Sequence, residues 1–209
     1  MLRALFAFFF FVSTLWGTSC AASQAAPVIL VLGDSISAGF GIAQEQSWPA
    51  LLGQRLQAGS YPYAVANISI SGETTRGGLS RLGPALKQHR PEIVIIALGA
   101  NDGLRGLPLE QMRDNLRAMI KLSQAGRARV LLLGMRLPPN YGIEYTRKFQ
   151  QIYSDIARQH KIALLPFLFD GFAERPDAFQ YDGLHPTAAT QALLLDNVWR
   201  RLQPLLRKQ

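Results

Sequence analysis

Continuous apolar runs alternate with segments of helical spacing along most of this 209-residue chain. Strands that are buried on both faces have apolar, β-branched sequences without polar alternation, and five segments fit this description: 28–32, 63–70, 93–98, 130–133 and 163–165. Apolar residues at helical spacing predict helices between and after them, near 48–56, 79–90, 109–124, 149–156 and 187–206. This alternation predicts the α/β class, with one domain whose parallel sheet carries helices on both faces.

The first 25 residues have a different pattern, which is typical of a secretory signal peptide. Arg3 precedes the nearly continuous apolar run 4–16, and a run of small residues follows this apolar run. That run is shorter than the roughly 20 residues that a membrane-spanning helix needs. We expect cleavage after Ala25, which makes residues 26–209 a single periplasmic or secreted domain. Cleavage after Ala21, lipidation of Cys20 or retention as an uncleaved anchor are open alternatives.

The composition limits the partners of the predicted domain. Cys20 is the only cysteine, so cleavage would leave no thiol or disulfide, and the formal net charge of the whole chain is +8. This excess of basic residues is typical of a solvated basic surface. The alternative interpretation is that it attracts the protein to anionic membranes or phospholipid head groups. Nucleic acid is not an expected partner, because the basic residues are scattered and an exported protein meets little of it. Nothing in the sequence requires more than a monomer.

Four polar loops lie where predicted strands or helices end: Gly33-Asp-Ser35, Ser71-Gly72, Gly99-Ala-Asn101 and Asp182-Gly-Leu-His185. The carboxyl ends of parallel strands share one edge of the sheet, and open α/β sheets place their chemistry at that edge. We therefore expect these segments to converge in space.

Together, these segments contain the groups that acyl transfer requires. Ser35 can be the nucleophile, His185 the base, and Asp182 the anion that holds the imidazole in the right tautomer. The backbone N–H groups of Ser35 and Gly72 and the side-chain amide of Asn101 can stabilise the developing oxyanion.

Each segment alone also has a purely structural interpretation. Gly-Asp-Ser is a common turn sequence, and Asn101-Asp102-Gly103 is composed of residues that are frequent in turns. Gly72 can be explained as a hinge without any role in catalysis. Asp34 and Asp102 are expected to brace their loops. His89 and His160 are expected near helix ends, where histidine stabilises the helix dipole. The joint appearance of all four segments, in this order, favours catalysis.

The same segments resemble the motif blocks of the SGNH, or GDSL, hydrolase family. The similarity extends over essentially the whole chain after the signal, including 103–106 and 137–142, and is greatest to small secreted bacterial thioesterases, lysophospholipases and arylesterases. It implies a three-layer α/β/α sandwich of flavodoxin-like type with a five-stranded parallel sheet. It also implies the catalytic triad Ser35, Asp182 and His185, with Gly72 and Asn101 as oxyanion donors. One departure is Ala100, where this group would have glycine, and its methyl group is expected to narrow the acyl entrance or slow the enzyme.

Other site classes fit the sequence less well. The nucleophile elbow of α/β-hydrolases needs glycine two residues after the serine, where this chain has Ser37. Three distant histidines do not suggest a metal site, and Gly33-Asp-Ser lacks the lysine and glycine spacing of a phosphate loop. No metal or cofactor is therefore expected.

The sequence thus predicts a cofactor-free serine hydrolase that cleaves esters and thioesters of acyl chains through an acyl-enzyme on Ser35. We expect apolar loop residues to contact the acyl chain, namely Leu104, Leu107, Pro138, Pro139 and Tyr141. A carbohydrate or peptidoglycan O-acetylesterase is the alternative enzyme. The alternative among proteins that are not enzymes is a lipid-binding module.

Overall fold

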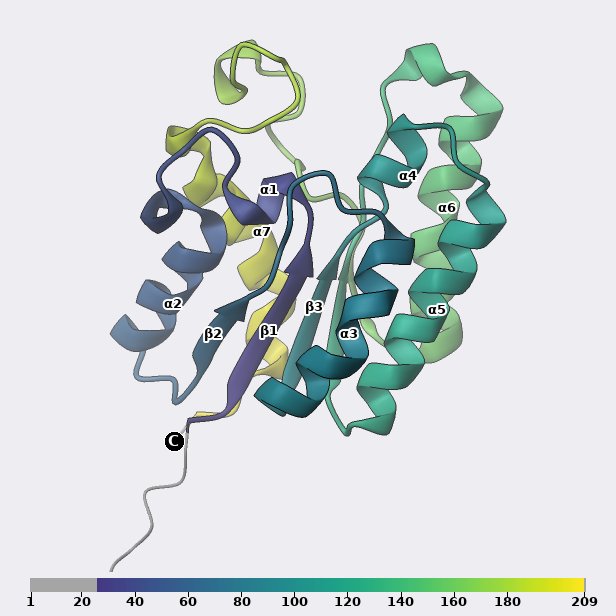
Figure 1. The fold of residues 1–209 in the computed structure, drawn as a ribbon. Helices are drawn as coiled ribbons and strands as arrows, with labels where there is room; N and C mark the ends of the chain where they lie inside the picture. The colour runs from purple at the N-terminus through teal and green to yellow at the C-terminus, as the bar shows by residue number, and fades with distance from the viewer. Residues whose placement is uncertain (1–25, 209) are drawn as a thin grey trace, which may run out of the picture.

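Five parallel strands form a single sheet in the order β2-β1-β3-β4-β5 (Figure 1). The computed structural model describes residues 26–208, so the predicted signal peptide and Cys20 lie outside the described residues. The strands are β1 (Val28–Gly33), β2 (Ala64–Asn67), β3 (Ile93–Ala97), β4 (Arg129–Leu133) and β5 (Ala163–Leu165).

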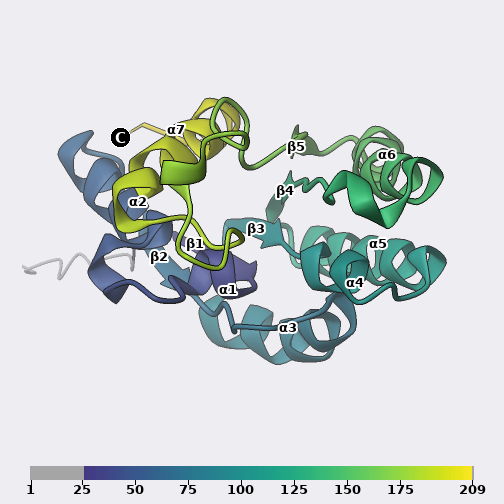
Figure 2. The same cartoon turned by 90° about the horizontal axis from the view of Figure 1, so that it is seen from above.

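Helices cover both faces of the sheet, and this confirms the predicted three-layer α/β/α fold (Figure 2). One face packs against α2 (Trp48–Ala58) and α7 (Gln191–Leu202). The other packs against α3 (Thr75–His89), α5 (Leu109–Ala125) and α6 (Ile143–His160). Two short helices, α1 (Ser35–Ala38) and α4 (Ala100–Leu104), follow β1 and β3 directly. Between residues 26 and 208, no helix has both the length and the apolar character needed to cross a bilayer.

The central strands explain why this sequence forms a buried sheet. The residues from Ile29 to Leu32 and from Ile93 to Ile96 are completely buried, because helices cover them on both sides. Trp48, at the start of α2, is also completely buried, and its backbone N–H donates to Gln191 Oε1 at 2.9 Å. This bond joins the first turn of α2 to the first residue of α7, so one helix layer is tied together near the functional edge of the sheet.

The predicted elements differ from the observed ones mainly at their ends. The second strand, Ala64–Asn67, is shorter than the predicted 63–70, although the backbone N–H groups of Ile68 and Ile70 still donate to β1, to Val31 O at 2.9 Å and Gly33 O at 3.1 Å. The Asn67 side-chain amide donates to Ser37 O at 2.8 Å. The predicted helix 187–206 consists of α7 flanked by the single 3₁₀ turns Ala188–Thr190 and Gln203–Leu205. Pro204 lacks an N–H and cannot continue the α-helical hydrogen bonds.

The strand order produces a switch point between β1 and β3. The chain moves from β1 to β2 on one side of the sheet and then returns to β3 on the other side. The two connections leave the sheet in opposite directions, which opens a crevice at the carboxyl ends of β1 and β3. The first and third polar segments follow these two strands.

Candidate active site

Ser35 is the first residue of α1, immediately after the buried strand β1. Asp34 forms the N-cap of this short helix, with its Oδ1 accepting the Ile36 N–H at 3.1 Å. Burial raises the pKa of Asp34 to about 6, and the hydrogen bond from Ile36 opposes that shift. Asp34 therefore braces the turn, as expected, and holds Ser35 at the edge of the sheet.

His185 is positioned by a loop that folds back on itself. The backbone N–H of Gln180 donates to His185 O at 2.7 Å, and Phe179 pairs with Pro186 in an antiparallel bridge. The Gln180 side-chain amide also donates to Phe40 O at 2.7 Å, which ties this loop to the segment after α1. The loop therefore places the imidazole over Ser35 although the two residues are far apart in the sequence.

Asp182 orients the imidazole from three residues earlier in the same loop. Its Oδ1 accepts the backbone N–H groups of Leu184 at 2.9 Å and His185 at 3.0 Å. These two bonds, followed by the bond from the imidazole, lower the pKa of Asp182 to about 2. The carboxylate is therefore ionised at neutral pH, and its Oδ2 is available to the ring.

The three side chains form one continuous hydrogen-bonded line. His185 Nδ1 lies 2.6 Å from Asp182 Oδ2, and His185 Nε2 lies 2.8 Å from Ser35 Oγ. An ionised carboxylate can only accept, so Nδ1 carries the proton and Nε2 is free to accept the Ser35 hydroxyl proton. This arrangement can activate a serine hydroxyl for attack on a carbonyl.

The three predicted donors border the same pocket as Ser35 and His185. Gly72 has a φ of +77°, a left-handed backbone conformation that glycine adopts readily. Its N–H and that of Ser35 have no acceptor among residues 26–208. Asn101 Nδ2 donates one hydrogen to Glu73 O at 3.1 Å, which leaves its second hydrogen for a ligand.

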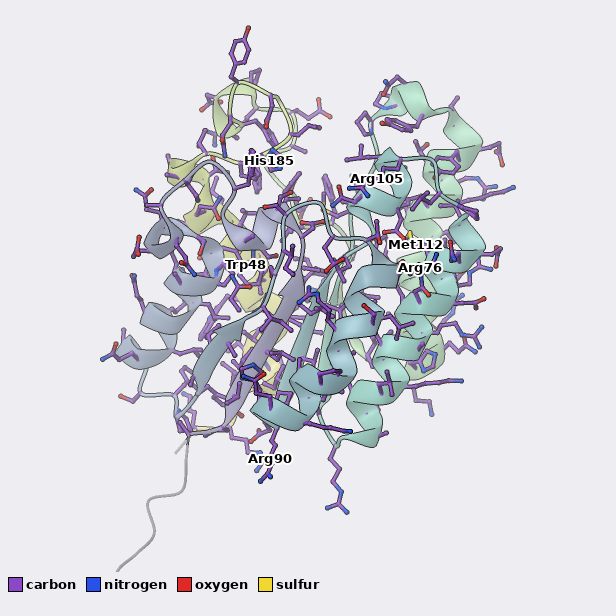
Figure 3. All side chains as sticks on the ribbon, in the orientation of Figure 1. Trp48, Arg76, Arg90, Arg105, Met112 and His185 are labelled. Atoms are coloured by element: carbon purple, nitrogen blue, oxygen red, sulfur yellow. The ribbon has the colours of Figure 1, made fainter. Side chains whose placement is uncertain are left out.

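Two contacts hold the Gly72 segment against α4. Asp102, which is buried, accepts the backbone N–H of Thr75 at 2.9 Å and the Thr75 hydroxyl, so it braces two elements at once. Arg105 Nη2 donates to Gly72 O at 2.8 Å. Figure 3 shows Arg105 at α4 and His185 beneath the loop above α1, at the same end of the molecule. These contacts hold the backbone on the C-terminal side of Gly72, whose own N–H is one predicted oxyanion donor.

The pocket has a volume of about 890 Å³ and only partly agrees with the predicted acyl contacts. Leu104, Pro138 and Pro139 line it, whereas Leu107 and Tyr141 do not. Tyr141 instead turns back, and its hydroxyl donates to Leu104 O at 3.0 Å. The carbonyl of Leu107 accepts from Tyr145 Oη at 3.2 Å, so both residues support the pocket loops from outside. Ala100 does line the pocket, and its expected effect on the acyl entrance stays a prediction.

Sequence reasoning missed most of the apolar wall. Residues 166–181 have little regular structure, and four phenylalanines from this stretch line the pocket: Phe167, Phe169, Phe172 and Phe179. Other lining residues outside the loops predicted to form the acyl groove are Ile36, Phe40, Met135, Arg136 and Leu184, whereas Leu137 begins the predicted loop 137–142. The density of aromatic residues in an otherwise irregular stretch was the available signal.

The remaining histidines lie at helix ends. His89 ends α3 and His160 ends α6, as expected. Burial and the nearby Arg117 lower the pKa of His160. The described part of the chain contains no group of three or more His, Cys, Asp or Glu side chains arranged to hold a metal ion.

Comparison with known proteins gives consistent matches over most of the chain. The model of the GDSL-like lipase/acylhydrolase family matches residues 31–193. Esterase TesA of Pseudomonas aeruginosa is 48% identical over 182 residues, which are 87% of this chain and 90% of that protein. Thioesterase 1/protease 1/lysophospholipase L1 of Escherichia coli strain K12 is 41% identical, over 88% of this chain and 87% of that protein.

Solved structures agree in fold as well as in sequence. The crystal structure of TesA matches with a TM-score of 0.84 and 48% identity, and the match covers 86% of this chain and 99% of that one. The family match spans more than half of the chain, and the fold agrees across the same region. The chain therefore belongs to the GDSL-like lipase/acylhydrolase family.

Proposed function

We propose that this protein is a serine hydrolase that cleaves carboxylic esters and thioesters of acyl chains. The observation that carries the proposal is the line of short contacts from Asp182 through His185 to Ser35 Oγ, at 2.6 and 2.8 Å. Membership of an acylhydrolase family and relatives named esterase and thioesterase support the same reaction.

The proposed reaction has two halves. His185 Nε2 takes the proton from Ser35 Oγ as this oxygen attacks the carbonyl carbon, and Asp182 stabilises the imidazolium. His185 then gives the proton to the leaving alcohol or thiol, which leaves an acyl group on Ser35. In the second half, water attacks the acyl group with His185 again as base, and the acid is released as Ser35 regains its proton.

The negative charge of each tetrahedral intermediate needs donors that are already in place. We assign this role to the N–H groups of Ser35 and Gly72 and to the second amide hydrogen of Asn101. Each such donor typically contributes roughly 10²- to 10³-fold to turnover. The left-handed φ of Gly72 and the bond from Asn101 to Glu73 O favour these assignments.

The pocket favours acyl chains over acetylated sugars. Its walls are mostly apolar, with phenylalanines on the side of β5, and such walls suit an alkyl chain. We therefore propose aliphatic acyl esters and thioesters as the substrate class. Lysophospholipid, which the name of one relative mentions, falls within this class.

We also propose that residues 1–25 direct export and are removed, and that the remaining domain acts as a monomer. Peripheral contact with lipid would use the pocket side of the molecule, where Phe40, Tyr181 and Leu184 are exposed. Because Arg3 is the only charged residue in 1–25, the remaining domain would have a net charge of +7, which would add attraction to anionic lipid.

The decisive experiment is the change Ser35→Ala. We expect hydrolysis of p-nitrophenyl butyrate to fall by roughly 10³-fold or more, with the circular dichroism spectrum unchanged. A fluorophosphonate probe should label the wild-type protein and not the variant. Retained turnover in Ser35→Ala would contradict the proposal, and a wild-type protein that binds fatty acid but resists labelling would favour the lipid-binding module.

A further inference from the structure

Arg136 brings a positive charge into a pocket whose walls are otherwise mainly apolar. It follows β4 and borders the pocket together with Phe167, which follows β5. The Arg136 guanidinium carbon lies 4.4 Å from the centroid of the Phe167 ring. This cation–π contact restrains the side chain at the wall.

The charge of Arg136 has no counterion within the described residues. Arg175 also borders the pocket, but its guanidinium pairs with Asp177 at 2.7 Å. Asp170 and Glu174 border the pocket as well, and neither forms an ion pair with Arg136. Arg136 is therefore the pocket cation that is available to a ligand.

The contact with Phe167 leaves the hydrogen-bonding groups of Arg136 accessible, since Arg136 is an exposed residue. A guanidinium uses its flat face against an aromatic ring, whereas its N–H donors project from the edge. No hydrogen bond engages these N–H groups within residues 26–208. A planar fork of free donors is suited to bidentate binding of a carboxylate or phosphate.

The strand order places this cation well away from the nucleophile. Ser35 follows β1, and β3 separates β1 from β4 in the sheet. Neighbouring strands are about 4.8 Å apart, so Arg136 begins roughly 10 Å from the strand that carries Ser35. Its contact with Phe167 directs it further toward β5. An anion at Arg136 would therefore belong to a part of the substrate remote from the ester.

We propose that Arg136 is a specificity-determining residue that binds an anionic group of the substrate, remote from the bond that is cleaved. This inference rests on the proposed hydrolase function and narrows its substrate class to acyl esters or thioesters carrying a carboxylate or phosphate. The anion can lie at the far end of the acyl chain or on the leaving group, and both present the same chemistry to the guanidinium.

The test compares two matched pairs of substrates. On the acyl side, p-nitrophenyl decanoate is compared with the mono-p-nitrophenyl ester of decanedioic acid, which adds a terminal carboxylate. On the leaving-group side, decanoyl-pantetheine is compared with decanoyl-CoA, which adds the phosphates. For each pair, the measured quantity is the ratio of kcat/KM for the charged substrate to kcat/KM for the neutral one.

We expect Arg136→Gln to lower this ratio by roughly tenfold or more in one of the two pairs, since a charge-assisted hydrogen bond is lost. The affected pair identifies where the anion lies. Arg136→Lys should retain part of the preference, because it keeps the charge but loses the planar fork. Arg158→Gln removes the same charge from an exposed position on α6 and should leave both ratios unchanged.

Two results would overturn the proposal. One is an unchanged ratio in both pairs for Arg136→Gln, and the other is an equal fall for charged and neutral substrates, which would indicate a structural role. Failure of the proposed hydrolase function is distinguishable, because it would appear as turnover of the neutral esters by Ser35→Ala.

Discussion

Two aspartates near Ser35 have opposite environments. Asp182 lies on an exposed loop and accepts two backbone N–H groups, so its pKa falls to about 2. Asp34 is buried under the same site, and desolvation raises its pKa to about 6. One carboxyl group is therefore a permanent anion beside His185, whereas the other binds a proton in mildly acidic solution.

The pKa of Asp34 leads to a prediction about stability. Between pH 3.8, the ordinary pKa of aspartate, and about 6, the folded protein holds a proton that the unfolded chain has released. This proton favours folding at low pH, and its contribution is lost as pH rises through about 6. A shift of about two pKa units corresponds to about 3 kcal/mol. In the variant Asp34→Asn, the side-chain amide oxygen can still accept the Ile36 N–H, but the side chain does not titrate in this pH range.

Urea unfolding of the wild type and Asp34→Asn across this pH range tests the prediction. The wild type should lose about 2 kcal/mol relative to the variant as pH rises from about 4 to 6, and about 3 kcal/mol over the wider range from about 3 to 7. Subtracting the variant's unfolding free energy from that of the wild type at each pH removes the contribution of Asp182, which is the same in both proteins. A difference that stays constant with pH would show that the Asp34 proton is not linked to folding.

At the scale of elements, α4 holds the peptide that directly follows one proposed oxyanion donor, the N–H of Gly72. Arg105, at the C-terminal end of α4, donates to Gly72 O, and the N–H of Gly72 borders the pocket. In Arg105→Leu the peptide between Gly72 and Glu73 should become freer to rotate, which would loosen the adjoining Gly72 N–H without removing it. We expect kcat to fall by roughly tenfold, less than for deletion of a donor, and KM to change little.

Steady-state kinetics with p-nitrophenyl butyrate measure kcat and KM for the wild type and Arg105→Leu. Arg76→Leu is the matched control, because Arg76 is an exposed arginine on α3 (Figure 3) and should leave both unchanged. Arg105→Lys, which keeps one donor, should recover part of kcat. A rise in KM with unchanged kcat would instead assign Arg105 to substrate binding.

The elements also show which parts of the fold could be predicted from the sequence. Buried parallel strands such as β1 and β3 have continuous apolar sequences, and these were located to within a residue at their ends. The predicted end of β2, at residue 70, lies three residues beyond the observed end at Asn67, although Ile68 and Ile70 still donate backbone N–H groups to β1. The sequence predicts no helix at α1, since four residues are too few for a periodic pattern.

At the scale of the whole molecule, polar motif residues were easier to predict than the pocket. Ser35, Gly72, Asn101, Asp182 and His185 lie together at one edge of the sheet because parallel strands end on the same side. The apolar wall depends on how the irregular stretch 166–181 folds over that edge, and no local pattern determines this. Leu107 and Tyr141, which are predicted to contact the acyl chain, do not line the pocket for the same reason. The position of a residue in a loop does not give the direction of its side chain.

The domain organisation provides the last prediction. A short apolar segment after Arg3, followed by small residues, is typical of a signal that peptidase removes, and cleavage after Ala25 would leave Ala26 as the first residue. The first strand begins at Val28, which pairs with Ala64 in the sheet. Because few residues separate the cleavage site from β1, export should yield a compact domain with a short N-terminal extension.

Intact-mass spectrometry of the protein released from a bacterial host that expresses the full chain tests this boundary. We expect the mass of residues 26–209, and Ala25→Leu, which places a large side chain at the cleavage site, should leave the longer precursor. The domain expressed directly from Ala26 should hydrolyse p-nitrophenyl butyrate at the same rate as the exported form. A membrane-bound product that carries a lipid on Cys20 would contradict cleavage after Ala25, and so would an exported product that retains all 209 residues.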